Sequence, residues 1–283
     1  MQEISCTRNM ILLDGKKLSE EILKNIKKRV KSHRLKLRLA VVQIGKNPAS
    51  QIFIRQKKKA CKKTGIGFKL FEFSARIKKS ELKKKIDKIC QDSKNSGVII
   101  QLPVPKKFHS EEGFTNLIPE KKDIDILSER SFGKYFFTGI KILPPVVDGI
   151  LRLLKNYKIK IKGKNIAVIG MGRLVGIPLI PQLLREFATP TIINVFTKNP
   201  SFFTKEADIL ISGVGKPNLI KQNMVRKGAI VIDAGTTLKK GKLVGDIDFR
   251  RVSKKASYIT PVPGGVGPMT VVCLLENLVK LNK

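Results

Sequence analysis

Short apolar runs alternate with amphipathic helical segments along most of this chain, and this alternation restricts the fold more than any other feature. Each apolar run is four to six residues long and is bounded by glycine, proline or polar residues, as strands are. In the first half these runs lie at 39–44, 68–73 and 97–102, and the helical segments lie at 18–30, 47–64 and 80–93. Strands that alternate with helices pair in parallel through crossovers. We therefore predict an α/β fold with a parallel sheet.

The same alternation starts again after an irregular stretch at 106–139 and a boundary at 142–145. A helix is expected at 147–157 and another at 178–187, where Pro178 and Pro181 must share the first turn unless Pro181 kinks the helix. Further apolar strands are expected at 165–169, 191–196, 209–212 and 229–233. This second series predicts a second α/β domain, because 283 residues are enough for two domains.

Residues 261–270 (PVPGGVGPMT) contain three prolines and three glycines, a composition that neither a helix interior nor a central strand tolerates. Helix-competent apolar sequence follows at 271–281. We predict a rigid loop that ends at a helix start, where glycines let a flat ligand approach the backbone. A structural turn is the alternative interpretation.

A glycine-rich loop at Gly170, Gly172 and Gly176 follows a predicted strand and opens a predicted helix. This is the context in which glycines let a dinucleotide's pyrophosphate approach a helix N-terminus. A site for NAD would place a carboxylate at the end of the next strand, but that position reads Phe-Thr-Lys-Asn at 196–199. Thr197 and Lys198, with Arg173, favour the ribose phosphate of NADP instead, although Lys198 is also typical of a solvated surface lysine.

Three further positions could carry chemistry. Phe53 and Lys57 are four residues apart, so they share one face of a helix, where an aromatic ring would lower the pKa of the lysine. Gln101 ends a buried strand and offers both a donor and an acceptor. Asp123 and Asp125 bring two of only 22 acidic residues into a basic segment. Taken singly, a surface lysine and a salt-bridged loop remain alternatives for Lys57 and the aspartates.

The net charge of +35 predicts attraction to any polyanion, but no nucleic-acid motif accompanies it. We expect nonspecific polyanion binding and no specific nucleic-acid partner. Four separated cysteines, Cys6 among them, and two histidines, His33 and His109, form no metal-ligand pattern, so no metal site is expected. No apolar run is long enough for a transmembrane helix and no signal-peptide core is visible, which predicts a cytoplasmic protein without membrane contact.

Taken together, these motifs resemble the bifunctional methylenetetrahydrofolate dehydrogenase and methenyltetrahydrofolate cyclohydrolase family over nearly the whole chain. The matching stretches are 14–16, 47–51, 101–103, 170–178, 213–217, 228–233, 244–249 and 261–270. The resemblance implies oxidation of 5,10-methylenetetrahydrofolate with NADP⁺, then hydrolysis to 10-formyltetrahydrofolate. It also implies tetrahydrofolate one-carbon derivatives as ligands, a homodimer, and a role in one-carbon metabolism and purine biosynthesis.

The resemblance also assigns domains and site residues. It implies a folate-binding catalytic domain at 1–146 and 265–283, with the last helix returning to it, and a Rossmann-type NADP-binding domain at 147–264. The implied catalytic residues are Lys57, Gln101 and Asp125. The implied substrate-binding residues are Phe53, Asp123, Pro263, Gly264 and Gly265. The implied cofactor-binding residues are Gly170, Gly172, Arg173, Gly176, Thr197, Lys198, Gly213, Gly215 and Thr236.

Four positions depart from the family pattern. Phe53 stands where the family usually has Tyr, Ile126 where it has Gly, and Gly172 where it has Ser; residues 144–147 read Pro-Pro-Val-Val instead of Pro-Cys-Thr-Pro. A dehydrogenase with impaired cyclohydrolase activity is therefore one alternative. A noncatalytic homologue that acts through its basic surface is another.

Overall fold

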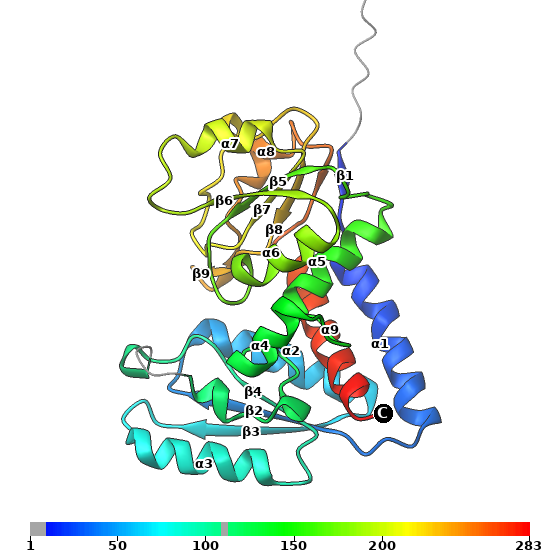
Figure 1. Cartoon of the computed structure of the whole chain (residues 1–283), viewed down its shortest axis with the longest axis vertical. Coiled ribbons are helices and arrows are strands. Elements are labelled where there is room, and N and C mark those ends of the chain that lie inside the picture. Colours follow the sequence, from blue (N-terminus) through cyan, green and yellow to red (C-terminus); the bar gives the residue numbers. More distant parts are fainter. Residues whose placement is uncertain (1–9, 109–112) are drawn as a thin grey trace, which may run out of the picture. The chain divides into compact units, whose positions relative to one another are not determined.

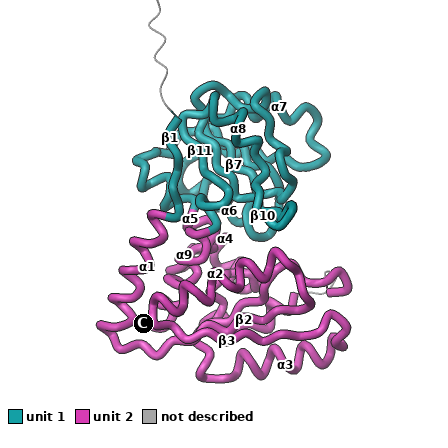
Figure 2. Tube along the Cα trace, turned by 180° about the vertical axis from the view of Figure 1, so that it is seen from behind, with its two compact units in different colours: residues 1–16, 150–267 teal, residues 17–149, 268–283 magenta. Residues whose placement is uncertain are grey.

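The computed structural model describes residues 10–108 and 113–283, which pack into two compact units (Figures 1 and 2). One unit comprises residues 17–149 and 268–283, and we call it the lysine unit because it holds Lys57. The other comprises, of the described residues, 10–16 and 150–267, and we call it the glycine-loop unit. Cys6 and His109 lie outside the described residues.

The lysine unit is built on a three-stranded parallel sheet of order β3-β2-β4. The central strand is buried along nearly its whole length, as its continuous apolar sequence predicts. Its strands are β2 (Arg38–Ile44), β3 (Gly67–Phe73) and β4 (Gly97–Ile100). Its helices are α1 (Gly15–Ser32), α2 (Pro48–Thr64), α3 (Lys79–Gln91), α4 (Glu129–Phe137) and α9 (Val266–Leu281), with short 3₁₀ turns at Lys106–Phe108, Phe114–Leu117 and Glu120–Lys122.

Helix α2 has the terminal signals that its sequence predicts. The Asn47 side chain accepts a hydrogen bond from the Ser50 N–H at 3.1 Å, and Pro48 occupies the first turn, where it has no N–H to satisfy. The helix ends at Gly65, whose φ of 76° suits glycine. These two caps fix the length of α2 and therefore the position of its inward face.

The last helix returns to the sheet of the lysine unit, as predicted. A side chain at Gly97 would collide with Leu278 of α9, since a Cβ there would lie 2.6 Å from the Leu278 side chain. Asn277 of α9 donates to the carbonyls of Ile124 and Leu143, at 3.0 and 2.8 Å. Together with the sheets, this confirms the predicted α/β fold of two domains with a returning C-terminal helix.

The glycine-loop unit contains a six-stranded parallel sheet of order β1-β11-β8-β7-β5-β6. Its strands are β1 (Ile11–Leu12), β5 (Asn165–Ile169), β6 (Thr189–Ile193), β7 (Ile209–Ser212), β8 (Ile230–Asp233) and β11 (Tyr258–Ile259). Around it lie α5 (Pro145–Asn156), α6 (Gly176–Arg185), α7 (Pro200–Glu206), α8 (Phe249–Val252), a 3₁₀ turn at Gln222–Met224, and the hairpin of β9 (Thr237–Lys239) and β10 (Lys242–Val244). Because β6 and β7 flank β5 on opposite sides, the winding reverses at β5, where ligands of such sheets bind.

The N-terminal strand β1 differs from the expected division of the chain. The sequence interpretation assigned residues 1–146 to the first domain, but Ile11 and Leu12 pair with Tyr258 and Ile259 of β11. The Leu13 N–H extends this pairing by donating to the Ile259 carbonyl at 2.8 Å. A two-residue strand is too short to show a periodic pattern, so its sheet could not be predicted.

Several predicted ends are also wrong. The helical segment predicted at 80–93 is α3, which begins at Lys79 after Lys78 in the cap position and ends at Gln91. Pro181 lies beyond the first turn of α6, in the helix interior. Strand β6 ends at Ile193 because the Asn194–Thr197 turn closes there. Strand β4 ends before Gln101, and α9 begins at Val266 rather than at 271, with Pro268 tolerated in its first turn.

Candidate active site

Lys57 and Gln101 meet in the interior of the lysine unit. Lys57 lies on the inward face of α2 and is 8% exposed, whereas its neighbours Lys58 and Lys59 are exposed. Its ammonium donates a hydrogen bond to Gln101 Oε1 at 2.7 Å. A buried amine with a fixed partner is unusual in so basic a chain, because lysine normally keeps its charge in water.

The Gln101 side chain is held in one orientation. Its amide nitrogen donates to the Leu102 carbonyl at 2.8 Å, so the amide oxygen faces Lys57. Ser50 lies two helical turns before Lys57 on α2, and its hydroxyl donates to the same carbonyl at 3.2 Å. The Gln101 N–H continues the sheet by donating to the Val42 carbonyl at 2.8 Å. The end of β4 therefore positions the acceptor that Lys57 uses.

The segment with Asp123 and Asp125 lies beside the same strand. Asp123 forms a parallel bridge with Val98 of β4, and its carboxylate accepts the N–H groups of Leu127 and Ser128, at 3.3 and 2.9 Å. Asn277 anchors the intervening Ile124. Asp123 thus stabilises the backbone of this segment. Asp125 is the carboxylate whose charge interacts with Lys57.

Burial shifts the protonation of this group of side chains. It lowers the pKa of the Lys57 ammonium, although the negative charge of Asp125 acts in the opposite direction. It raises the pKa of Asp125 to about 6, against the attraction of Lys57. Cys61, one helical turn after Lys57, has its thiol pKa raised to about 12 by burial and is therefore neutral. The pKa of Lys57 is thus lowered and that of Asp125 is raised, and shifts in these directions suit proton transfer near neutral pH.

The remaining substrate-binding predictions divide between the two units. Phe53 is half-buried on α2, one turn before Lys57. Pro263, Gly264 and Gly265 belong to the glycine-loop unit, where the Gly265 N–H donates to the Pro261 carbonyl at 2.8 Å. Phe53 therefore belongs to the same unit as Lys57, Gln101 and the aspartates, whereas the Pro/Gly loop belongs to the other unit.

The predicted cofactor loops pack against each other in the glycine-loop unit. Gly170 has a φ of +94°, and a Cβ at Gly176 would lie 1.8 Å from its carbonyl oxygen. A Cβ at Gly213, after β7, would lie 2.5 Å from the Val175 side chain. A Cβ at Gly172 would instead meet only the Gly213 carbonyl oxygen, at 3.9 Å, so this side of the loop is open. The cradle fits a dinucleotide at the point where the sheet reverses.

The predicted phosphate-binding pair lies in the turn beyond β6. The Thr197 hydroxyl accepts the Asn194 N–H at 3.0 Å, and Lys198 is exposed. The residue that directly follows the strand is Asn194 rather than one of the group at 196–199, and it also lacks a carboxylate. Arg173 is exposed in the glycine loop, and Thr236 is half-buried after β8. Gly215 has a φ of +78° in the loop after β7.

Sequence reasoning missed two buried carboxylates in this unit. Asp233 is 4% exposed and Asp246 is fully buried, and both accept hydrogen bonds from loops at the carboxyl end of the sheet. The scarcity of acidic residues, 22 against 57 basic ones, was a signal that could have identified them. Acidic residues of a highly basic chain are most informative where apolar sequence surrounds them, as at 229–233.

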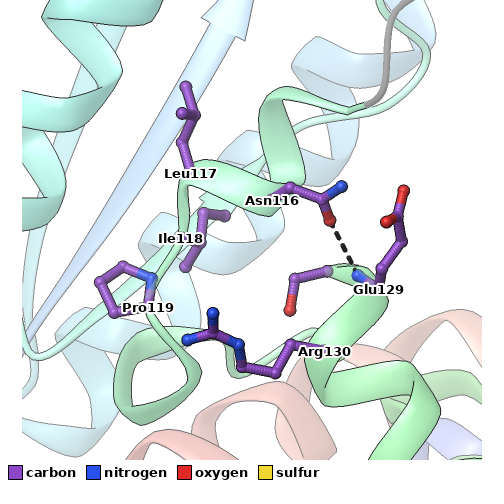
Figure 3. A pocket seen from close by; sticks show the side chains of 7 residues that line it. Asn116, Leu117, Ile118, Pro119, Glu129 and Arg130 are labelled. Atoms are coloured by element: carbon purple, nitrogen blue, oxygen red, sulfur yellow. Dashed lines mark hydrogen bonds between the residues drawn. The ribbon is translucent and has the colours of Figure 1, made fainter.

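The described residues also contain a cavity away from the predicted site residues. A cavity of about 510 Å³ in the lysine unit is lined by residues 116–119 and 128–130 (Figure 3), where Asn116 accepts the Glu129 N–H at 2.8 Å. It contains no predicted site residue. Within the described part of the chain, no cluster of three metal-ligating side chains occurs. Every described helix is too short or too polar to span a bilayer.

Both units of the chain match families of known proteins. Residues 13–125 match the family described as "Tetrahydrofolate dehydrogenase/cyclohydrolase, catalytic domain", and residues 144–283 match the corresponding "NAD(P)-binding domain". The "Bifunctional protein FolD" of Nautilia profundicola is 43% identical, across 97% of this chain and 98% of its own.

Solved structures are similar over the same extent. The bifunctional enzyme FolD from Campylobacter jejuni is 39% identical with a TM-score of 0.89, covering 96% of this chain and 98% of its own. The dehydrogenase-cyclohydrolase of Trypanosoma brucei, complexed with NADP cofactor and inhibitor, is 29% identical with a TM-score of 0.89, covering 96% and 97%. The chain therefore belongs to the tetrahydrofolate dehydrogenase/cyclohydrolase family.

Proposed function

We propose that this protein oxidises 5,10-methylenetetrahydrofolate with NADP⁺ and then hydrolyses the methenyl product to 10-formyltetrahydrofolate. The observation that carries this proposal is the buried contact between Lys57 and Gln101, at 2.7 Å, beside Asp125. Membership of the family supports both steps. The catalytic residues are Lys57, Gln101 and Asp125, and the substrate-binding residues are Phe53, Asp123 and the loop of Pro263, Gly264 and Gly265.

The oxidation step requires positioning more than proton transfer. When bound, NADP⁺ would supply the acceptor for a hydride from the carbon that bridges two folate nitrogens. Those nitrogens stabilise the cation that results, so the protein mainly orients two ligands and excludes water. We assign the orientation of the cofactor to the glycine loop, whose open side lies at Gly172, and to the loop after β7, which packs on it through Gly213. Arg173, Thr197, Lys198 and Thr236 complete the proposed cofactor site.

The hydrolysis step requires a proton carrier. Water adds to the methenyl carbon, the bond from that carbon to N5 breaks, N5 gains one proton and a second proton is released. Lys57 suits this transfer because burial lowers the pKa of its ammonium toward neutral pH. Gln101 holds the Lys57 nitrogen in place, and Asp125 stabilises the charged form when the lysine carries the proton.

Separate assays of the two steps test the proposal. Purified protein is incubated with methylenetetrahydrofolate and NADP⁺ to follow oxidation, and with methenyltetrahydrofolate alone to follow hydrolysis. Both activities are expected. Oxidation without hydrolysis would favour the alternative of an impaired cyclohydrolase. The absence of both, together with salt-sensitive binding to nucleic acid, would favour the noncatalytic homologue.

We expect NADP⁺ to be preferred over NAD⁺, and Lys198→Ala to weaken NADP⁺ binding by roughly tenfold to a hundredfold. Lys198 follows the turn beyond β6, where no carboxylate is available for the ribose hydroxyls of NAD. The check is a comparison of the Michaelis constants of both cofactors in the wild type and the variant. Lys205→Ala, on the exposed face of α7, serves as the control for lost surface charge. An unchanged NADP⁺ constant would remove Lys198 from the site.

The broader assignments rest on the family resemblance. We propose a cytoplasmic homodimer that supplies one-carbon units for purine biosynthesis. Strand β3 lies at the edge of its sheet within the described residues, so a second copy could pair along it. Sedimentation at micromolar concentration would measure the oligomeric state, and a mass of one chain at all concentrations would contradict the dimer.

We also expect nonspecific binding to polyanions. One cavity of about 430 Å³ on the lysine unit is lined by Arg55, Lys58, Lys59, Lys62, Ile66 and Phe68, so four basic side chains meet there. Retention on heparin should fall steeply between about 50 and 200 mM salt, as counterion release predicts. DNA of unrelated sequences should bind equally. Binding to one sequence that survives high salt would instead indicate a specific nucleic-acid partner.

A further inference from the structure

Two buried carboxylates organise the carboxyl end of the six-stranded sheet, yet neither has a role in the proposed chemistry. Asp233 is the last residue of β8, and Asp246 follows β10. Placing two carboxylates in a protein interior is unfavourable, because each loses its hydration and they repel each other. Burial accordingly raises the pKa of Asp233 to about 6. Such a pair needs compensating hydrogen bonds.

Asp246 receives these bonds mainly from the loop after β7. Its Oδ2 accepts the Ser212 hydroxyl and the Val214 N–H, both at 2.7 Å, and its Oδ1 accepts the Lys216 N–H at 2.8 Å. A Cβ at Gly235 would lie 2.1 Å from the carboxyl carbon of Asp246, so only glycine leaves room for the carboxylate there. Asp246 therefore fixes three alternate residues, at the end of β7 and in the loop that follows it.

Asp233 holds Asp246 in turn. It accepts the N–H groups of Gly235 and Asp246 at 3.1 Å each, and that of Ile247 at 2.9 Å. The Asp233 N–H donates to the Thr260 hydroxyl at 2.7 Å. The two carboxylates thus connect the ends of β7 and β8 with the segment at 245–247, and they leave Asp246 little freedom to move.

The loop that Asp246 fixes is one wall of the proposed cofactor cradle. Gly213 packs on Val175, and a Cβ at Gly170 would lie 2.9 Å from the Val214 side chain. Both amides that the loop offers at Val214 and Lys216 point inward to the carboxylate, so they are not available to phosphate groups. The loop after β7 therefore contributes the shape of the cradle and not these two N–H donors. The phosphate groups of the cofactor would be bound by the glycine loop and its neighbours.

We propose that Asp246 is a positioning residue of the NADP site: its carboxylate turns the Val214 and Lys216 amides inward and so sets the loop after β7 at the shape that the cofactor requires. This proposal rests on the proposed function. Asp246 touches neither substrate nor cofactor, and its effect passes through Gly213, Val214 and Gly215.

The variant Asp246→Asn tests this role with almost no change of volume. An Asn side chain has one acceptor oxygen and one NH₂ group, so in either orientation its NH₂ faces a backbone N–H, at Lys216 or at Val214. We expect the dissociation constant of NADP⁺ to rise about tenfold to a hundredfold, measured by calorimetry below the unfolding temperature. The Michaelis constant of methylenetetrahydrofolate should stay within about twofold, because the side-chain hydrogen bonds of Asp246 among the described residues go to Ser212, Val214 and Lys216 and not to the proposed folate residues.

The control is Asp208→Asn at the opposite end of β7. Asp208 also accepts a backbone N–H, from Asn165 at 3.1 Å, and it pairs with Arg226 at 2.9 Å. Its variant should bind NADP⁺ as the wild type does. Equal weakening by both variants would mean general destabilisation and would overturn the positioning role, as would unchanged NADP⁺ binding by folded Asp246→Asn.

Two further arms complete the test. If Asp246→Asn does not fold, Ser212→Ala removes one hydrogen bond to the same carboxylate, and we expect binding weaker by about three- to tenfold. Wild-type affinity in folded Ser212→Ala would then overturn the proposal. If the wild type itself does not bind NADP⁺, the proposed function fails first, whereas tight wild-type binding with insensitive variants refutes only the role of Asp246.

Discussion

Replacing Lys57 with Met is expected to lower the hydrolysis of methenyltetrahydrofolate by about 100- to 10,000-fold, the usual contribution of general acid–base catalysis. Methionine keeps the length and apolar packing of the lysine stem but carries no proton. The stem is buried and the amine donates to Gln101 at 2.7 Å, so the substitution removes the proton carrier and leaves the surrounding side chains in place. Arg is no substitute, because its guanidinium stays protonated at working pH.

Two comparisons make this prediction specific. Oxidation of methylenetetrahydrofolate by the same variant should fall much less, because that step needs no such proton carrier. Lys58→Met removes the adjacent, exposed lysine of the same run, and both steps should keep their wild-type rates. Hydrolysis by Lys57→Met at the wild-type rate would show that Lys57 is not the proton carrier, and the mechanism proposed above would be wrong.

Lys57 illustrates what the sequence could and could not predict about the site. Its spacing from Phe53 predicts a shared helix face, which α2 confirms. The run at 57–59 does not say which lysine points inward, because three consecutive helix positions cover most of the circumference. The register of α2, set by the cap at Asn47 and by Gly65, decides that Lys57 is buried. The motif resemblance chose the same residue without this geometry.

Ile126 departs from the family pattern, and only the fold shows how the chain accommodates it. The family usually has glycine at this position, and the Ile126 backbone keeps the conformation that glycine favours, with a φ of +57°. A β-branched residue is strained there. The Ile126 side chain is 1% exposed and packs with Tyr135 and Ile142, so its burial offsets the strain. Sequence alone shows the substitution but not this compensation.

Contacts between distant segments account for most of what the sequence left unpredicted. Alternating apolar runs predict both sheets, but nothing local indicates that β1 joins β11 or that Asp123 bridges to Val98. The carboxylates Asp233 and Asp246 lie within matching stretches, yet their shared loops appear only when the ends of β7 and β8 meet. A motif therefore locates such residues without revealing their partners.

The second large effect is expected at the first residue of α6. Gly176→Ala should lower the free energy of unfolding by about 3 kcal/mol or more, at the upper end of overpacking effects. The added Cβ would lie 1.8 Å from the Gly170 carbonyl oxygen and 2.9 Å from its carbon. Both atoms belong to the backbone, so no side-chain rotation relieves the collision, and the glycine loop must move. NADP⁺ binding should weaken by more than about tenfold with it.

Gly172→Ala is the matched control, since it adds the same methyl group four residues earlier in the same loop. A Cβ at Gly172 would meet only the Gly213 carbonyl oxygen, at 3.9 Å, and Gly172 does not have a positive φ. Its stability should change by less than about 0.5 kcal/mol, as surface substitutions usually do. The same open space leaves room for the Ser side chain that relatives usually carry at this position. Thermal unfolding of both variants, with NADP⁺ titration of Gly176→Ala against the wild type, provides the check. Equal stability of the two variants, together with wild-type NADP⁺ binding by Gly176→Ala, would mean that the loop can shift, and the close approach of Gly170 and Gly176 would not define the cofactor cradle.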